Sequence, residues 1–179
     1  MFMKLLEKRR SIRKFTDRAI EPEKIKILSE AALRSPSGRG VNPWEFIIVE
    51  DREMLANLSK AKKSGAALLK GAALGIVVCA DPTKSDTLIE DASIAAIIIQ
   101  LAAESLGIGS CWVQMHNRMH PDGRPATEHI AQLLDIPANY MVQCVIALGY
   151  PAETKAPHPE ASLDFGKVYK GRFGHKLYA

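Results

Sequence analysis

The 179-residue sequence is 47% apolar and 25% charged, a globular composition that excludes a disordered or fibrous chain. This length suits one domain with a substantial core, so we predict a single domain over residues 1–179. The formal net charge is only +4 and aromatic residues make up 6%, a pattern that argues against a nucleic-acid-binding protein.

The amino-terminal region combines a short apolar segment with a dense cluster of positive charge. Residues 1–7 carry a lysine at the fourth position and are too short for a secretory signal peptide. Residues 9–13 then read Arg-Arg-Ser-Ile-Arg. Planar guanidinium groups suit phosphate, so this cluster predicts an anion site. A basic surface patch and a nucleic-acid contact are the alternatives, and the modest overall charge makes the second the weaker one.

Helices and strands alternate along the rest of the chain. Pro22 in a first turn and a regular apolar face predict a helix over 21–33, and the Gly-, Ser- and Pro-rich residues 34–43 predict a loop. Apolar runs predict strands over 44–49, 75–80, 110–115 and 141–148. Further helices are expected over 51–63, 87–106 and 126–134. The Pro-rich segment from Pro151 is expected to be extended, across the surface or onto a partner.

The predicted helix over 87–106 is apolar on nearly all sides. Ile94, Ile97, Ile98 and Leu101 form one stripe, and alanines occupy most of the remaining surface. A helix of this kind is buried all round. It is either the core helix of a monomer or a helix whose second face packs on another subunit, with alanine allowing close approach. For a domain of this size we favour the second interpretation and predict a dimer.

The cysteines and the length of the apolar stretches indicate the cellular compartment of the protein. Cys79, Cys111 and Cys144 lie in separate apolar runs, which predicts buried thiols under reducing conditions. The longest uncharged apolar stretch, residues 92–103, is shorter than a membrane span. We therefore expect a cytoplasmic protein with no membrane partner.

Common catalytic and metal-binding motifs do not account for the chain. Residues 107–112, Gly-Ile-Gly-Ser-Cys-Trp, begin like a dinucleotide fingerprint, but they follow a helix and end in tryptophan where a glycine is needed. His116 and His120 lie four apart beside a Pro-Asp-Gly turn and lack the helix-borne glutamate of a zinc protease, so no metal is predicted. Anion binding remains as the interpretation of the basic residues. Lys170 and Arg172 form a second basic group near the carboxyl end.

Four motifs, in this order and spacing, resemble the FMN-dependent nitroreductase family. They are Arg-Arg-Ser-Ile-Arg-Lys-Phe over 9–15, Ser-Pro-Ser-Gly over 35–38 running into Asn-Pro-Trp-Glu-Phe over 42–46, Gly-Ile-Gly-Ser-Cys-Trp-Val over 107–113, and Gly-Tyr-Pro over 149–151. The resemblance covers nearly the whole chain. It implies an α+β fold with a mainly antiparallel central sheet flanked by helices. It also implies an intertwined homodimer that binds two FMN molecules at its interface, with the tail of one subunit reaching over the other.

The resemblance further implies which residues hold FMN. The phosphate, the ribityl chain and the pyrimidine edge would be contacted by Arg9, Arg10, Ser11 and Arg13. The flavin would be contacted from the second subunit by Pro36, Ser37 and Gly38, with Asn42 in the same loop. The isoalloxazine would be bordered by Trp112, Val113 and Gln114. Lys170 and Arg172, near the end of the chain, would also contact the phosphate.

One part of the pattern departs from the family. Gly40 and Asn42 stand where family members commonly carry Asn and Gln. Glycine offers no side-chain hydrogen bond, and Asn is one methylene shorter than Gln. The chain also looks short of the insertions that form a lid in larger relatives. A more open flavin pocket is therefore expected.

The implied function is an FMN-dependent oxidoreductase that uses NAD(P)H to reduce nitroaromatic or quinone-like acceptors with ping-pong kinetics. The flavin would carry the chemistry, so no catalytic side chain is predicted. Arg13 or Lys14 would stabilise the anionic reduced flavin. His116, Arg118 and His120 would line the pocket mouth, unless they are ordinary exposed loop residues. Two alternatives stay open: an FMN storage or sensing module with little turnover, and an anion-binding dimer without flavin.

Overall fold

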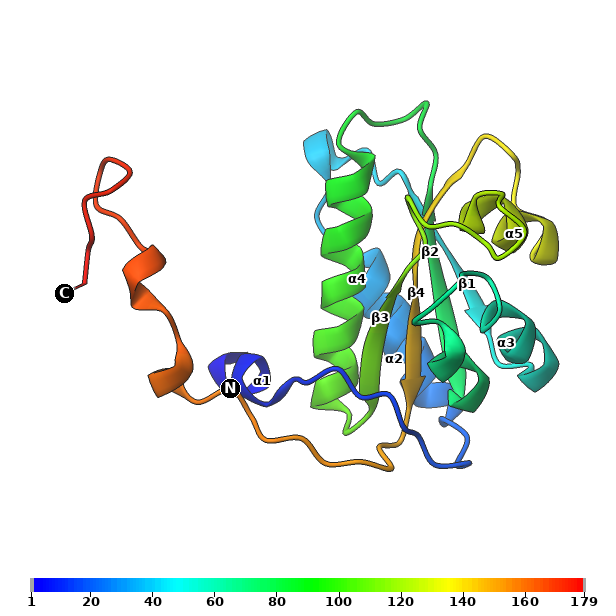
Figure 1. The fold of residues 1–179 in the computed structure, drawn as a ribbon, viewed down its shortest axis with the longest axis horizontal. Coiled ribbons are helices and arrows are strands. Elements are labelled where there is room, and N and C mark those ends of the chain that lie inside the picture. Colours follow the sequence, from blue (N-terminus) through cyan, green and yellow to red (C-terminus); the bar gives the residue numbers. More distant parts are fainter. Residues whose placement is uncertain (1, 179) are drawn as a thin grey trace.

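A computed structural model, which describes residues 2–178, has a four-stranded sheet at its centre (Figure 1). The spatial order is β1-β2-β4-β3, and every neighbouring pair is antiparallel. The strands are β1 (Trp44–Val49), β2 (Leu74–Ala80), β3 (Gly109–Gln114) and β4 (Met141–Gly149). Each predicted strand is present to within one residue at either end. The α+β fold with a mainly antiparallel sheet is thereby confirmed.

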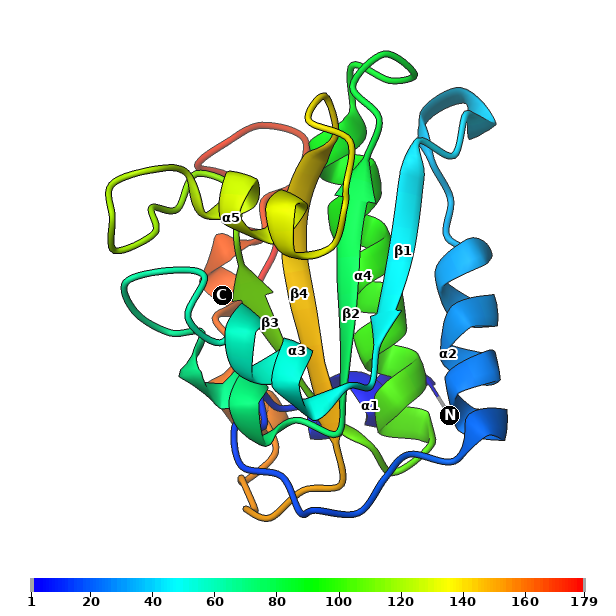
Figure 2. The same cartoon turned by 90° about the vertical axis from the view of Figure 1, so that its right-hand side faces the viewer.

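Helices cover both faces of this sheet (Figure 2). Over residues 2–178 the α-helices are α1 (Phe2–Lys8), α2 (Pro22–Leu33), α3 (Arg52–Leu58), α4 (Leu88–Ser105) and α5 (Ala126–Leu133). Side chains of α2 and α4 form one core with one face of the sheet, and those of α3 and α5 form a second core with the other face. Strands β2 and β4 are buried on both sides, which explains their continuous apolar sequences.

The long helix α4 turns its small residues to the sheet. Ala92, Ala96 and Ala103 are completely buried in the core, whereas Ile94 and Ile97 are each 38% exposed. Small side chains let the helix approach the sheet closely. We predicted the alanines as the surface for a partner, but Ile94 and Ile97 face outward, whereas Ile99 is buried with the alanines. A strongly apolar outer face is left on this helix.

Two local differences from the predicted elements have physical causes. The helix predicted over 51–63 ends at Leu58, because the chain tightens into turns that bury Ala61 and Ala66 in the core. Helix α1 was not predicted, and none of its side chains is buried. The segment after Pro151 is largely extended, as expected, with short 3₁₀ turns at Glu160–Ser162 and Phe165–Lys167.

The predictions for the three thiols agree with the structure, since Cys79, Cys111 and Cys144 are all buried. Burial raises the pKa of Cys79 to about 11. Within residues 2–178, no helix has both the length and the apolar character needed to cross a membrane.

A polar cluster joins the start of α2 to the end of β4 and leads to a pH-dependent prediction. The Tyr150 hydroxyl donates to Glu21, Lys24 Nζ donates to that hydroxyl at 2.7 Å, and Arg18 both pairs with Glu21 and lies 4.0 Å from the Tyr150 ring centre. The Tyr150 hydrogen bond is the largest of the effects that lower the pKa of Glu21 to about 2.

A carboxyl with a lowered folded-state pKa stabilises the fold above its ordinary pKa of 4.5, and this contribution is lost as pH falls towards 2. We therefore expect Glu21→Gln to unfold at lower denaturant than the unmodified protein near pH 6, with the difference closing by about pH 2. Glu23→Gln, on the exposed side of the same helix, is the control and should show little difference at any pH. Urea unfolding across this range measures both, and a pH-independent gap for Glu21→Gln would contradict the prediction.

Candidate functional site

The arginine-rich segment runs along the outer edge of the sheet after α1 ends at Lys8. Ser11 forms a parallel bridge with Ser110 at the start of β3, and the Ile12 backbone N–H donates to the Ser110 carbonyl at 2.9 Å. Ile12 is buried against Gly109, where an added Cβ would lie only 3.0 Å from the Cβ of Ile12. Glycine at position 109 therefore lets the basic segment lie directly on the strand.

Alternate residues of this segment meet different surroundings. Ser11 and Arg13 lie close to Cys111 on β3. Arg10 instead donates from Nη1 to the carbonyl of Ala156 in the tail. Arg9 is half-buried, and its backbone N–H still closes the last turn of α1 by donating to Leu5. The structure thus brings Ser11 and Arg13 together and engages Arg10 with the carboxyl-terminal segment.

Cations from three parts of the sequence gather around Cys111. Burial raises the pKa of the Cys111 thiol, and the positive charges of Arg13, Lys155 and Lys62 oppose that rise. Lys155 Nζ donates to the Ser11 carbonyl at 2.6 Å, and Arg13 Nη1 donates to the same oxygen at 3.3 Å. This group, Arg13, Lys62 and Lys155, is called the Cys111 cation cluster below.

Lys62 is half-buried, and the charge of a further cation, Arg118, acts on it. Its pKa is lowered, first by burial and then by the charge of Arg118. Glu153 supplies a carboxylate, which accepts from the backbone N–H of Arg13 at 2.5 Å and lies 3.5 Å from Lys155. The Arg13 N–H is the largest contribution to the lowered pKa of Glu153. Glu153 therefore balances part of the positive charge of the Cys111 cation cluster, and the remaining positive charge would attract an anion.

Two cations of the cluster were missed from the sequence. Lys155 follows the Gly-Tyr-Pro motif. Because β4 ends at this motif beside the basic segment, the residues after it could have been expected near the arginines. The Phe15–Pro151 bridge and the Lys14 carbonyl, which accepts from Ala152, place that segment alongside. Lys62 lies in the turns after α3, where several lysines occur together. Nothing in its local sequence separates it from its neighbours.

The loop over residues 35–42 is a compact unit at the other end of α4. The Asn42 backbone N–H donates to Ser37 Oγ at 2.9 Å, and that hydroxyl donates to Asn42 Oδ1 at 2.8 Å. Arg39, Gly40 and Asn42 have left-handed backbone conformations. Among the described residues of this chain, an added Cβ on Gly40 would meet nothing within 4 Å; the more open flavin pocket stays a prediction. The side chain of Asn42 is therefore engaged in a hydrogen bond within the loop. Pro36 is exposed.

The predicted flavin-bordering residues of β3 point to both faces of the sheet. Val113 is buried with the α3 and α5 core, whereas Trp112 packs against the α2 and α4 core. Trp112 Nε1 donates to Gln114 Oε1 at 2.8 Å, and Gln114 Nε2 donates to the His116 carbonyl at 3.0 Å. A ligand that touched all of them would lie along the free edge of β3, an outer strand of the sheet.

The histidine loop divides between two environments. The charge of Arg118 helps to lower the pKa of Lys62, so Arg118 belongs to the surroundings of the cation cluster. His120 instead stacks on His129 of α5, with ring centres 4.2 Å apart, and its Nδ1 lies 2.9 Å from Asp122. His116 is half-buried at the end of β3. Among residues 2–178, no group of three or more potential metal ligands is found.

The basic pair of the tail is not brought to the arginine segment of the same chain. Lys170 and Arg172 are exposed, and their backbone bonds with His175 close a small terminal turn. Figure 1 shows this part of the chain projecting away from the sheet, beyond α1. The tail carries several exposed apolar side chains as well: Leu163, Phe165, Val168, Phe173, Leu177 and Tyr178.

Comparison with known proteins gives one consistent result. Residues 6–81 and 60–150 match the Nitroreductase family. A candidate NADH dehydrogenase/NAD(P)H nitroreductase of Archaeoglobus fulgidus is 41% identical over 86% of this chain and 87% of its own length. A protein with the same name from Methanothermobacter thermautotrophicus is 37% identical over 84% of this chain and 78% of its own. The structure of an FMN-dependent nitroreductase from Clostridium difficile R20291 is 47% identical, with a TM-score of 0.94 over 96% of this chain and 99% of that one.

Proposed function

The chain belongs to the nitroreductase family, and from this membership we propose that it is an FMN-dependent oxidoreductase that takes electrons from NAD(P)H and reduces nitroaromatic or quinone-like acceptors. The printed names of its relatives support both FMN and NAD(P)H. A single pocket that serves donor and acceptor in turn would give ping-pong kinetics. The observation that carries the proposal is the Cys111 cation cluster beside the Ser11 segment.

The residues present fit FMN. The cluster has more positive charge than Glu153 balances, and it adjoins a serine hydroxyl and the backbone of an edge strand. Arg9 and Ser11 would hold the phosphate, and Arg13 with Lys62 would place positive charge beside the flavin. When bound, FMN supplies the redox chemistry, and this chain supplies binding, orientation and charge. Arg118, beside Lys62, would border the mouth of the site.

Each complete site would need two chains. The loop over 35–42 adjoins the amino-terminal end of α4, whereas Ser11 and Ser110 lie just beyond its carboxyl-terminal end. Figures 1 and 2 place the loop between α2 and β1 and the segment that follows α1 at opposite ends of the sheet. An 18-residue helix is about 27 Å long. Ser37 and Gly38 would therefore meet the FMN held by the partner's arginine segment.

Two surfaces support a homodimer of this kind. The outer face of α4 exposes Ile94 and Ile97, and an exposed apolar face of this sort typically marks a protein interface. The projecting tail has apolar side chains that its own chain does not cover. Laid across a partner, the tail would bury them and carry Lys170 and Arg172 towards the second FMN phosphate.

The proposal is tested by the visible spectrum of the purified protein and by anaerobic titration with NADH and NADPH. We expect a yellow protein that holds one FMN per chain, and the flavin absorbance should bleach when one of the nucleotides is added. A nitroaromatic compound or a quinone should then restore the absorbance. Protein that stays colourless after addition of FMN would refute the proposal. Bound FMN that neither nucleotide reduces would instead favour a storage or sensing module.

A further inference from the structure

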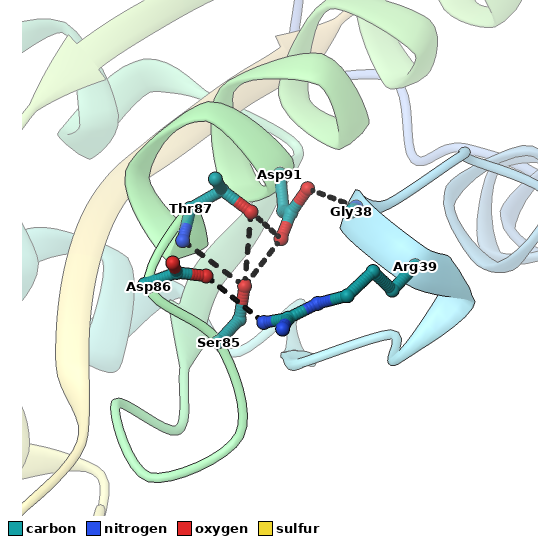
Figure 3. A network of polar contacts seen from close by, with 6 residues as sticks. All are labelled: Gly38, Arg39, Ser85, Asp86, Thr87 and Asp91. Atoms are coloured by element: carbon teal, nitrogen blue, oxygen red, sulfur yellow. Dashed lines mark hydrogen bonds and ion pairs between the residues drawn. The ribbon is translucent and has the colours of Figure 1, made fainter.

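A buried carboxylate holds the 35–42 loop to the first turn of α4 (Figure 3). Asp91 is only 2% exposed. Its Oδ1 accepts the backbone N–H of Gly38 at 2.8 Å, and its Oδ2 accepts the hydroxyls of Ser85 at 3.0 Å and Thr87 at 3.2 Å. The Ser85 hydroxyl also accepts the Thr87 backbone N–H at 3.1 Å, so the carboxylate and both hydroxyls form one network.

The loop lies tightly against this network. An added Cβ on Gly38 would lie 2.5 Å from Thr87 Oγ1, so only glycine allows the backbone to approach this closely. A second link, between Arg39 Nη2 and Asp86 Oδ1 at 3.0 Å, is exposed on both sides and contributes little. The buried bond from Gly38 to Asp91 is therefore the stronger attachment of the loop.

The loop and its attachment together form a rigid unit. The two hydrogen bonds between Ser37 and Asn42 close the loop on itself, and Asp91 fixes the closed loop to a long helix. The three donors to Asp91 are neutral, so the carboxylate gains hydrogen bonds but no ion pair from them. A carboxylate buried in this way is costly unless its hydrogen bonds are kept. This arrangement suits a residue that specifies where the loop lies.

We propose that Asp91 is a positioning residue that fixes the 35–42 loop on α4, so that Ser37 and Gly38 are presented to FMN bound by the partner chain. The inference rests on the proposed function, because it assumes that this loop contacts flavin across the dimer. Asp91 itself acts through Gly38 and does not touch the flavin. Loss of its acceptor oxygen would release the loop and weaken FMN binding from a distance.

The test measures FMN affinity by flavin fluorescence quenching in three full-length variants. Asp91→Ala removes the acceptor, and we expect its Kd for FMN to rise at least tenfold. Asp91→Asn keeps one oxygen for the Gly38 N–H and offers an NH₂ group to the Ser85 hydroxyl, so its Kd should stay within threefold of the unmodified protein. Asp86→Ala removes only the exposed pair with Arg39 and is the matched control, with a Kd expected to stay within twofold.

Amide hydrogen exchange separates positioning from general destabilisation. In Asp91→Ala, exchange should accelerate at residues 38–42 while the amides of β2 and β4 stay protected. If Asp91→Ala does not fold, Asp91→Ser decides the question, since its shorter polar side chain removes the carboxylate that accepts the Gly38 N–H and leaves the loop sequence unchanged. A rise in Kd for that variant supports the proposal, and an unchanged Kd overturns it.

The outcomes also separate this inference from the function on which it rests. An unmodified protein that binds no FMN contradicts the proposed function. An unmodified protein that binds FMN, with Asp91→Ala equal to it, overturns only the role of Asp91. Equal weakening by Asp91→Ala and Asp91→Asn also overturns it, because charge and not the hydrogen bond would then be responsible.

Discussion

Replacing Arg9 and Ser11 together with alanine is expected to strip FMN from the protein. Hydrogen bonds to charged groups contribute about 1.5–3 kcal/mol each. Losing two of them at the phosphate should raise the Kd for FMN by roughly 140-fold to 20,000-fold. The fold should survive, because Ile12 and the backbone bond to Ser110 anchor the segment independently of the two changed side chains.

Fluorescence quenching of added FMN measures this change, and the purified double variant should be colourless. Arg52→Ala is a suitable control because it removes an exposed guanidinium whose partner is Asp17. We expect that control to keep its flavin. FMN affinity that survives the double replacement would show that the phosphate binds elsewhere.

Replacing Ile97 with lysine is expected to separate the two chains of the proposed dimer. Ile97 lies on the outer face of α4 and is 38% exposed in the single chain. An ammonium group placed inside an apolar interface loses its hydration without gaining a partner. A disrupted interface centre costs about 2–4 kcal/mol, which raises the dimer dissociation constant roughly 30-fold to 700-fold.

Sedimentation velocity over a range of protein concentrations follows the dissociation. FMN should be lost in parallel, because each site is proposed to include the partner's 35–42 loop. Ile27→Lys on α2 is the matched control, since Ile27 is 44% exposed on a different helix. A variant at Ile97 that stays dimeric at the lowest concentrations would place the interface on another surface.

Much of the site could be predicted because its motifs are continuous in sequence. The basic segment over 9–13 and the strand that follows Gly109 were both recognised, and the structure joins them through Ser11 and Ser110. Lys62 could not be predicted in the same way. Its charge acts on Cys111 only because the turns after α3 bring it there, and its local sequence carries no sign of that placement.

Side-chain orientation on α4 shows a second limit of sequence reasoning. Its pattern indicated that nearly every side would be covered, but isoleucine and alanine are equally compatible with a sheet or with a partner. Which side chains of α4 face the sheet depends on how closely the helix approaches β2 and β4. The structure places the alanines in that core. Asp91 was not singled out at all, because an acidic residue in the first turn of a helix is ordinary in any sequence.

The sequence by itself determined the α+β class, the positions of the four strands and the family, because these follow from local apolar runs and from motifs in a fixed order. Only the tertiary structure decided which cations meet around Cys111, which side of α4 faces outward, and that Asp91 secures the 35–42 loop. These features depend on contacts between segments far apart in the chain, and the geometry of such contacts is set by packing of the whole fold. The length of α4 separates the two halves of the proposed site within one chain. The proposed function therefore requires a second chain.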